Sequence, residues 1–311
     1  MKNSLLSTSV LVVTTALVQP LDAATSFSGI GDFNSAVNWD DGDALTANDL
    51  PGANNGPGIV TGTATTSGDY LMANNSGPGD GGVTDIVVNG TLNLGHELQL
   101  RSGTVAQSSD LWVGAGTGNS GTLNVTTGGQ VDIAGAATFL FVGVDGAPVG
   151  LGGSGFGTVN FEAGSTYQIQ KGFTVENGII NFSLGMNFLT GAQNNFDIGS
   201  NGTLQFSGLT GGNAPTFSPS GADFDVSSGA TLQLDFAGAL AGESYTLVDS
   251  ISNPGYNSFD NVVVNGLAPD QQAVVNYGTD TLSVSIVAIP EPSSTLLVGL
   301  AGVGLLIRRR K

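Results

Sequence analysis

A five-residue phrase with alternating polar and apolar positions recurs through the middle of the chain. In most copies glycine comes first, the third and fifth residues are apolar, and threonine with asparagine or glutamine fills the other two positions. Successive side chains of a β-strand point to opposite faces. Each copy therefore predicts a short strand with one apolar and one polar face. The copies are Gly90–Leu94, Gly121–Val125, Gly157–Phe161, Gly178–Phe182, Gly202–Phe206 and Ala230–Leu234.

A second phrase, Leu111–Gly114, returns 29 residues later as Leu140–Gly143. The copies of the first phrase are spaced 31, 36, 21, 24 and 28 residues apart. Repeats at periods of about 20–50 residues are typical of solenoids and propellers, and unequal spacing favours stacked rungs with loops of different length. We therefore expect an all-β chain in which residues 90–236 form a parallel β-solenoid of about six to nine rungs. A β-sandwich is the alternative.

The two ends of such a solenoid need covering, because open strand edges pair with other chains. Residues 24–89 are polar and rich in turns, and we expect them to form an N-terminal cap region anchored by Phe33, Val37 and Trp39. Residues 237–288 are expected to form a C-terminal β cap, an antiparallel meander of strands around Tyr245, Val262–Val264 and Leu282–Ile286.

The composition narrows the functional classes. The chain has 49 glycines, no cysteine, one histidine and a formal net charge of −18. The lack of cysteine excludes disulfides and thiolate metal sites. The acidity argues against nucleic acid or an anionic membrane as a partner of the mature protein.

The N-terminal residues 1–23 have the layout of a secretory signal peptide. Lys2 precedes an apolar run, and small residues follow at Ala23 and Ala24. This order of charged, apolar and small positions predicts export through the Sec machinery and removal by signal peptidase.

The C-terminal residues have three features in sequence. Pro290, Glu291 and Pro292 come first, an apolar segment follows, and Arg308, Arg309, Arg310 and Lys311 end the sequence. The 15 residues 293–307 would form a helix of about 22 Å, which is short for a bilayer core of about 30 Å. The basic cluster would hold its end on the cytoplasmic side, so we expect a short transmembrane helix that anchors the chain transiently in the inner membrane.

These residues, 289–311, resemble the PEP-CTERM sorting tail of exported proteins from Gram-negative bacteria, with Ile289 where valine is usual. The resemblance implies recognition by an exosortase and a destination at the cell surface or in an extracellular polysaccharide matrix, as in a biofilm. The body resembles the repeats of autotransporter-type β-helical passengers, and the segment 33–51 is similar to their opening.

Few residues carry chemistry. The single histidine, His96, is expected to be structural. The segment Gly116–Gly121 matches the glycine pattern of dinucleotide-binding loops, but a strand is expected to follow it where that motif needs a helix. Asp40, Asp41 and Asp43 are calcium candidates, although they lack the spacing of a 12-residue calcium loop. We expect no cofactor and no catalytic residue.

Two functional hypotheses remain. The first is an exosortase-processed structural or adhesive protein (an adhesin) with no catalysis of its own. The alternative is a glycosidase or lyase acting on an extracellular polysaccharide. Its acid and base would come from the group Asp40, Asp41 and Asp43 or from the pair Asp223 and Asp225. A lyase on acidic sugars also needs cations, and only Arg101 and Lys171 lie between the two ends of the chain.

Overall fold

The structure, a computed structural model, consists of strands and turns in all the residues that it describes. These are residues 25–27, 30–32, 58–66, 70–73, 86–88, 90–94, 97–101, 110–133, 139–145, 153, 155–169, 172–190, 195–218, 223–249, 251 and 257–290. Within these ranges no helix is long and apolar enough to cross a membrane. The predicted signal peptide and the predicted helix of the tail lie outside them.

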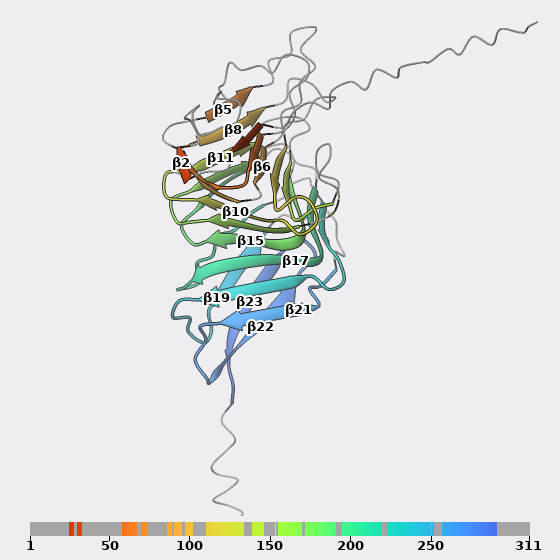
Figure 1. Ribbon diagram of the computed structural model, residues 1–311. Coiled ribbons are helices and arrows are strands. Elements are labelled where there is room, and N and C mark those ends of the chain that lie inside the picture. Colours follow the sequence, from red (N-terminus) through yellow and green to blue (C-terminus); the bar gives the residue numbers. More distant parts are fainter. Residues whose placement is uncertain are drawn as a thin grey trace, which may run out of the picture.

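Nine strands stack in parallel along the length of the molecule and form what we call column two (Figure 1). At about 4.8 Å per strand the column is roughly 40 Å long. Column two consists of β2 (Ile30–Asp32), β4 (Thr63–Thr65), β7 (Thr91–Leu94), β10 (Ser120–Val125), β13 (Phe156–Phe161), β15 (Gly172–Ser183), β17 (Asn195–Leu209), β19 (Thr231–Phe236) and β21 (Asn261–Asn265).

All six copies of the five-residue phrase lie in column two, in register with one another. Thr122 pairs with Thr91 on one side and with Thr158 on the other, and the pairing continues through the later copies without a slip inside the phrase. The predicted parallel stacking is therefore confirmed, whereas a β-sandwich would need antiparallel strands packed face to face.

Column one stands beside column two and carries the second phrase, since Leu140 of β12 pairs with Leu111 of β9. The long strands β15 and β17 run around the corner, so their first halves belong to column one and their second halves to column two. The other members of column one are β1 (Thr25–Phe27), β3 (Gly58–Val60), β6 (Ile86–Val88), β9 (Leu111–Val113), β12 (Leu140–Val142) and β18 (Asp223–Val226).

The third side of the solenoid is built in two ways. Its first part, column three, is parallel and consists of β5 (Tyr70–Ala73), β8 (Glu97–Arg101), β11 (Gln130–Ile133), β14 (Thr166–Ile169) and β16 (Asn187–Thr190). Beyond β16 an antiparallel sheet covers the interior instead. It consists, in spatial order, of β20 (Ser244–Val248), β23 (Leu282–Ala288) and β22 (Gln271–Tyr277).

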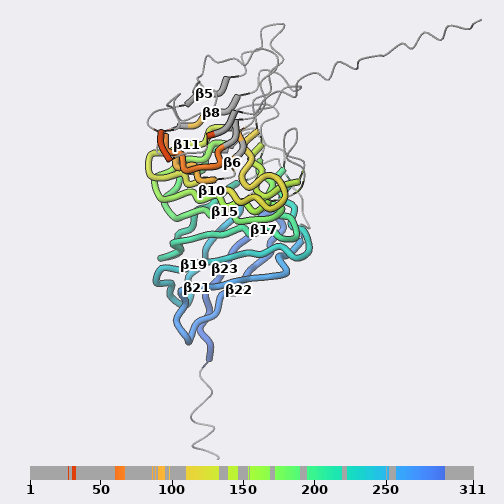
Figure 2. Tube along the Cα trace, in the orientation of Figure 1, coloured from red at the N-terminus to blue at the C-terminus, as the bar shows by residue number. Residues whose placement is uncertain are grey.

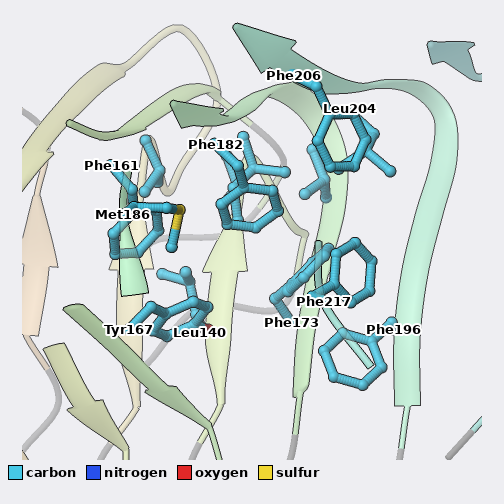
Figure 3. Close-up of a cluster of buried hydrophobic side chains, with 14 of the residues drawn as sticks. Leu140, Phe161, Tyr167, Phe173, Phe182, Met186, Phe196, Leu204, Phe206 and Phe217 are labelled. Carbon is cyan, nitrogen blue, oxygen red and sulfur yellow. The ribbon is translucent and has the colours of Figure 1, made fainter. Parts of the chain in front are cut away.

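The interior is one continuous apolar core. Inward residues of column two such as Leu92, Leu123 and Leu232 are fully buried, and so are Tyr245 and Val284 of the antiparallel sheet. Phe217 lies at the junction where column three ends. Its ring centroid is 5.3–6.4 Å from those of six phenylalanines, most of which are labelled in Figure 3. The six are Phe173, Phe182, Phe188, Phe196, Phe206 and Phe224.

The rungs extend beyond the range 90–236 that the phrase predicts. In the region expected to be an N-terminal cap, β4 already pairs in parallel with β7. The sequence signal is weak there because the inward position holds only Ala64. At the other end, Val262–Val264 were expected in an antiparallel meander. They instead form the last parallel strand, β21, on β19, and the run of three valines hides the alternation of a rung. Residues Phe33, Val37 and Trp39 lie outside the described residues.

Candidate functional site

The outer side of column two carries a ladder of amide side chains. Asn124 Nδ2 donates a hydrogen bond to Asn93 Oδ1, and Asn160 Nδ2 donates to Asn124 Oδ1, both at 2.9 Å. These residues occupy the fourth position of the phrase, which points outward because the third and fifth point into the core. The ladder fixes the amides of successive rungs, and the threonines at the second position form a parallel row beside it.

A carboxylate ends this polar row near the last rungs. Asp235 Oδ2 accepts a hydrogen bond from Gln205 Nε2 at 2.5 Å, and its Oδ1 accepts one from Asn265 Nδ2 at 2.6 Å. From Asn93 to Asn160 the ladder is uncharged. Asp32 of β2 stands in the same outward row at the other end, through its register with Thr65 and Asn93.

The outer side of column one changes character along the molecule. Trp112 and Phe141 are stacked with centroids 4.2 Å apart, and Trp112 is nearly buried because Phe141, Ala115 and Val144 pack around it.

Further along column one the side chains are acidic. Asp197 and Asp225 are register partners on β17 and β18, and Thr174 Oγ1 donates to Asp197 Oδ2 at 3.3 Å. Burial raises the pKa of Asp197, and the negative charges of Asp225, Asp223 and Glu176 raise it further.

The predicted carboxylate pair therefore gains a partner that the sequence did not indicate. Asp223 and Asp225 are exposed and lie two residues apart on β18. Asp197 joins them from the preceding rung, and the signal that could have found it is the match between Asn195–Ile198 and Asp223–Val226. Within the described part of the chain, no group of three or more acidic or histidine side chains is placed to hold a metal ion.

The other predicted candidates have different outcomes. The segment from Gly116 to Asn119 is a turn that leads directly into strand β10, so the dinucleotide-like pattern precedes a strand, as expected. Asp40, Asp41, Asp43, His96 and Lys171 lie outside the described residues. Arg101 ends β8.

The chain leaves the solenoid at the end opposite β1 and β2 (Figure 2). Strand β23 ends at Ala288, and Ile289 and Pro290 follow it as exposed residues. Ile289 N still donates a hydrogen bond to Asp270 O at 2.7 Å, so the body holds the chain up to this position. Glu291, Pro292, Arg308, Arg309, Arg310 and Lys311 lie outside the described residues.

A comparison with protein families identifies the segment that follows β23. Residues 288–311 match the PEP-CTERM protein-sorting motif. The PEP-CTERM motif indicates an exported protein whose C-terminus is anchored in a membrane until an exosortase processes it. It begins on the last residue of β23, so the sorting signal follows the folded body directly. Searches of curated proteins and of solved structures found no match to the chain.

Proposed function

We propose that the protein is a structural or adhesive component of the cell surface or extracellular matrix of a Gram-negative bacterium, with no catalysis of its own. The observation that carries this proposal is the PEP-CTERM motif placed directly after a parallel β-solenoid. The motif supports export and processing by an exosortase. The solenoid provides a long body in which outward amide side chains of successive rungs hydrogen-bond to one another.

The proposed partner is an extracellular polysaccharide, bound along the outer side of column two. Hydroxyl and amide groups hydrogen-bond sugar hydroxyls without needing charge. The half-exposed threonines of successive rungs, with the fixed amides beside them, repeat such groups at about 4.8 Å along the column. The net charge of −18 disfavours an acidic polymer, so the partner is a neutral glycan.

The test replaces hydroxyls by methyl groups and leaves the amide ladder intact. The variant carries Thr91→Val, Thr122→Val and Thr158→Val, which keep the β-branched shape and the strand propensity. The mature protein is taken from the cell surface, and its retention on the isolated matrix is measured in a co-sedimentation assay. We expect the variant to fold normally and to be retained several-fold less.

The matched control makes the same change on other sides of the molecule, at Thr166, Thr246 and Thr279. We expect this control to be retained like the unmodified protein. Equal retention of both triple variants would contradict glycan binding by the outer side of column two. It would not contradict export and processing by an exosortase.

A second candidate is an enzyme that cleaves the polysaccharide. It is favoured by the raised pKa of Asp197 beside Asp225, because glycosidases use one protonated and one ionised carboxyl group. If this candidate is right, Asp197→Asn abolishes the release of reducing ends from the matrix polysaccharide, and Asp249→Asn, an exposed aspartate elsewhere, does not. The structural proposal expects no such release from any form of the protein.

A further inference from the structure

The antiparallel sheet ends in an open strand edge. In the described part of the chain, its strands follow one another in the order β20, β23, β22, and β22 pairs only with β23. The other edge strand, β20, is joined to the solenoid, because Val248 forms a bridge with Phe217. β22 lies at the lower end of the molecule in Figure 1, away from column three. The outer edge of β22 is therefore the free end of this sheet.

The hydrogen bonds of β22 show which backbone groups point to the open edge. Ile289 N donates to Asp270 O at 2.7 Å, just before the strand begins. The register between β22 and β23 has no bulge, and in an antiparallel pair every second residue bonds to the same neighbour. The even-numbered residues of β22 therefore bond to β23. The N–H and C=O groups of Ala273 and Val275 point away from β23, to the open edge.

This edge lacks the features that usually protect edge strands. Such strands are kept from pairing with another chain by charged side chains, proline or a bulge. Over its seven residues β22 has no charged side chain, no proline and no bulge. The whole chain has a net charge of −18, so an uncharged strand is a place where two copies can meet with little repulsion. The edge is suited to the addition of a further β-strand.

The sequence of β22 is complementary to a second copy of itself. The second strand lies antiparallel to the first, with Val274 of both copies at a two-fold axis. The backbone groups of Ala273 then face those of Val275 of the second copy, as a hydrogen-bonded pair requires. On the outer face Gln272 lies opposite Asn276 of the second copy. Amide thus faces amide, as in the amide ladder of column two.

The burial of β22 indicates that its apolar positions lack a neighbour. Ala273 and Val275 point toward the core but are only half-buried, whereas their register partners on β23, Ile286 and Val284, are buried. The difference arises because β23 has a strand on both sides and β22 has one on a single side. A second copy of β22 would cover Ala273 and Val275 on the inner face and Val274 on the outer face.

We propose that two copies of the mature protein pair through β22 in an antiparallel, two-fold symmetric dimer, so that their two antiparallel sheets become one continuous sheet. The contact is closed, because each copy contributes its one β22 edge, and it does not propagate into fibres. The two solenoids extend from the contact in opposite directions. The dimer carries the outer side of column two twice, so the glycan binding proposed above becomes bivalent.

The test uses disulfide cross-linking of single-cysteine variants, since the chain has no cysteine of its own. In the dimer the two Val274 residues form a non-hydrogen-bonded pair with Cα atoms about 4.5 Å apart, a separation that a disulfide spans. Val287 provides the matched control. It is 40% exposed, against 39% for Val274, and lies on the same face of β23. Its two copies would be separated by at least three strand spacings, about 14 Å.

The surface fraction of native cells is treated with a mild oxidant, and covalent dimer is measured on a non-reducing gel. We expect most of the Val274→Cys protein, and little of the Val287→Cys protein, to become a covalent dimer.

A charge variant tests the contact without a cross-link. Val274→Lys places like charges opposite each other at the axis and is expected to weaken the dimer about tenfold. The measurement is the dissociation constant of the mature protein by sedimentation equilibrium. The control, Val287→Lys, adds the same charge beyond the screening length of about 10 Å, and we expect it to dimerise like the unmodified protein. Both positions are exposed, so neither variant should disturb the fold.

Several results would overturn the dimer proposal. One is a mature protein that stays monomeric at every concentration, which would leave glycan binding by a single solenoid unaffected. Another is equal cross-linking of Val274→Cys and Val287→Cys, as random collision produces. A Val274→Lys protein that dimerises as tightly as Val287→Lys would place the contact elsewhere on the molecule. Protection of the β22 amides from hydrogen exchange by the matrix, in a protein that stays monomeric, would assign the edge to a different partner.

Discussion

Glycine opens the repeated phrase because the corner between columns one and two has no room for a side chain. A Cβ atom on Gly121 would lie 1.8 Å from the carbonyl oxygen of Val88, and one on Gly157 would lie 2.3 Å from that of Val113. These oxygens are already fixed, since Gly114 N and Gly143 N donate hydrogen bonds to them at 2.8 and 2.9 Å. The sequence indicated a corner at these glycines, but only the structure shows how closely the preceding rung approaches them.

Replacing Gly121 by alanine is expected to destabilise the fold by about 1–3 kcal/mol, because a new methyl group must displace a hydrogen-bonded carbonyl. The measurement is the urea midpoint of the mature protein. The neighbouring exposed residue provides the control, since Ser120→Ala adds no contact and should change the free energy of unfolding by less than about 0.5 kcal/mol. Equal midpoints for the two variants would contradict the corner explanation.

Tyr245 gives a prediction about pH. Its hydroxyl donates a hydrogen bond to the Glu243 carboxylate. Burial and this bond raise the pKa of Tyr245 to about 12, from the usual value of about 10. Because the folded state favours the neutral phenol, this stabilisation is complete below pH 10 and is lost as the pH rises toward 12.

The expected observation is a tyrosinate absorbance step near pH 12 that is missing in Tyr245→Phe. Glu243→Gln is expected to move this step to lower pH, because it removes the negatively charged group that accepts the hydrogen bond of the phenol and so raises the pKa of Tyr245. A step that stays in place in Glu243→Gln would show that the carboxylate does not contribute.

At the scale of elements, the repeated strands were predicted, and so was the antiparallel pairing of the strands around Tyr245 and Leu282–Ile286. The end of column three was not predicted. Parallel stacking followed from the phrase because its apolar positions recur in the same order. The place where column three stops depends on Phe217, whose surrounding sequence carries no repeat signal. Two backbone hydrogen bonds hold Phe217 beside β20. Phe217 N donates to Leu247 O at 3.2 Å, and Asp249 N donates to Phe217 O at 3.0 Å. This residue therefore joins the solenoid to the antiparallel sheet.

Phe217→Ala is expected to cost about 3–5 kcal/mol, the usual range for removing a buried phenylalanine. The loss should be larger for the last rungs, because the antiparallel sheet loses its link to the core. Hydrogen exchange of β19, β20 and β23 measures this directly. The control is Phe156→Ala, since Phe156 is 44% exposed on β13. A Phe217→Ala protein that keeps the exchange protection of β20 would contradict the linking role.

At the scale of the whole molecule, the sequence predicted an acidic all-β body between two targeting segments. The candidate binding face could be anticipated in part, because the outward threonines and asparagines are visible in the phrase. Asp223 and Asp225 were anticipated as a pair, but Asp197 was not placed beside them, because it is distant in sequence and meets them through the register of β17 and β18. The parallel strand β21 was hidden for a different reason, since its three consecutive valines do not show which of them point inward.

The central proposal is that the chain is a precursor whose two ends are removed on the way to the cell surface. Intact-mass measurement of the protein isolated from the surface fraction of native cells tests it most directly. We predict a mass that lacks residues 1–23 and the apolar and basic residues 296–311. A mature surface protein whose mass still includes Leu296 to Lys311 would contradict the account.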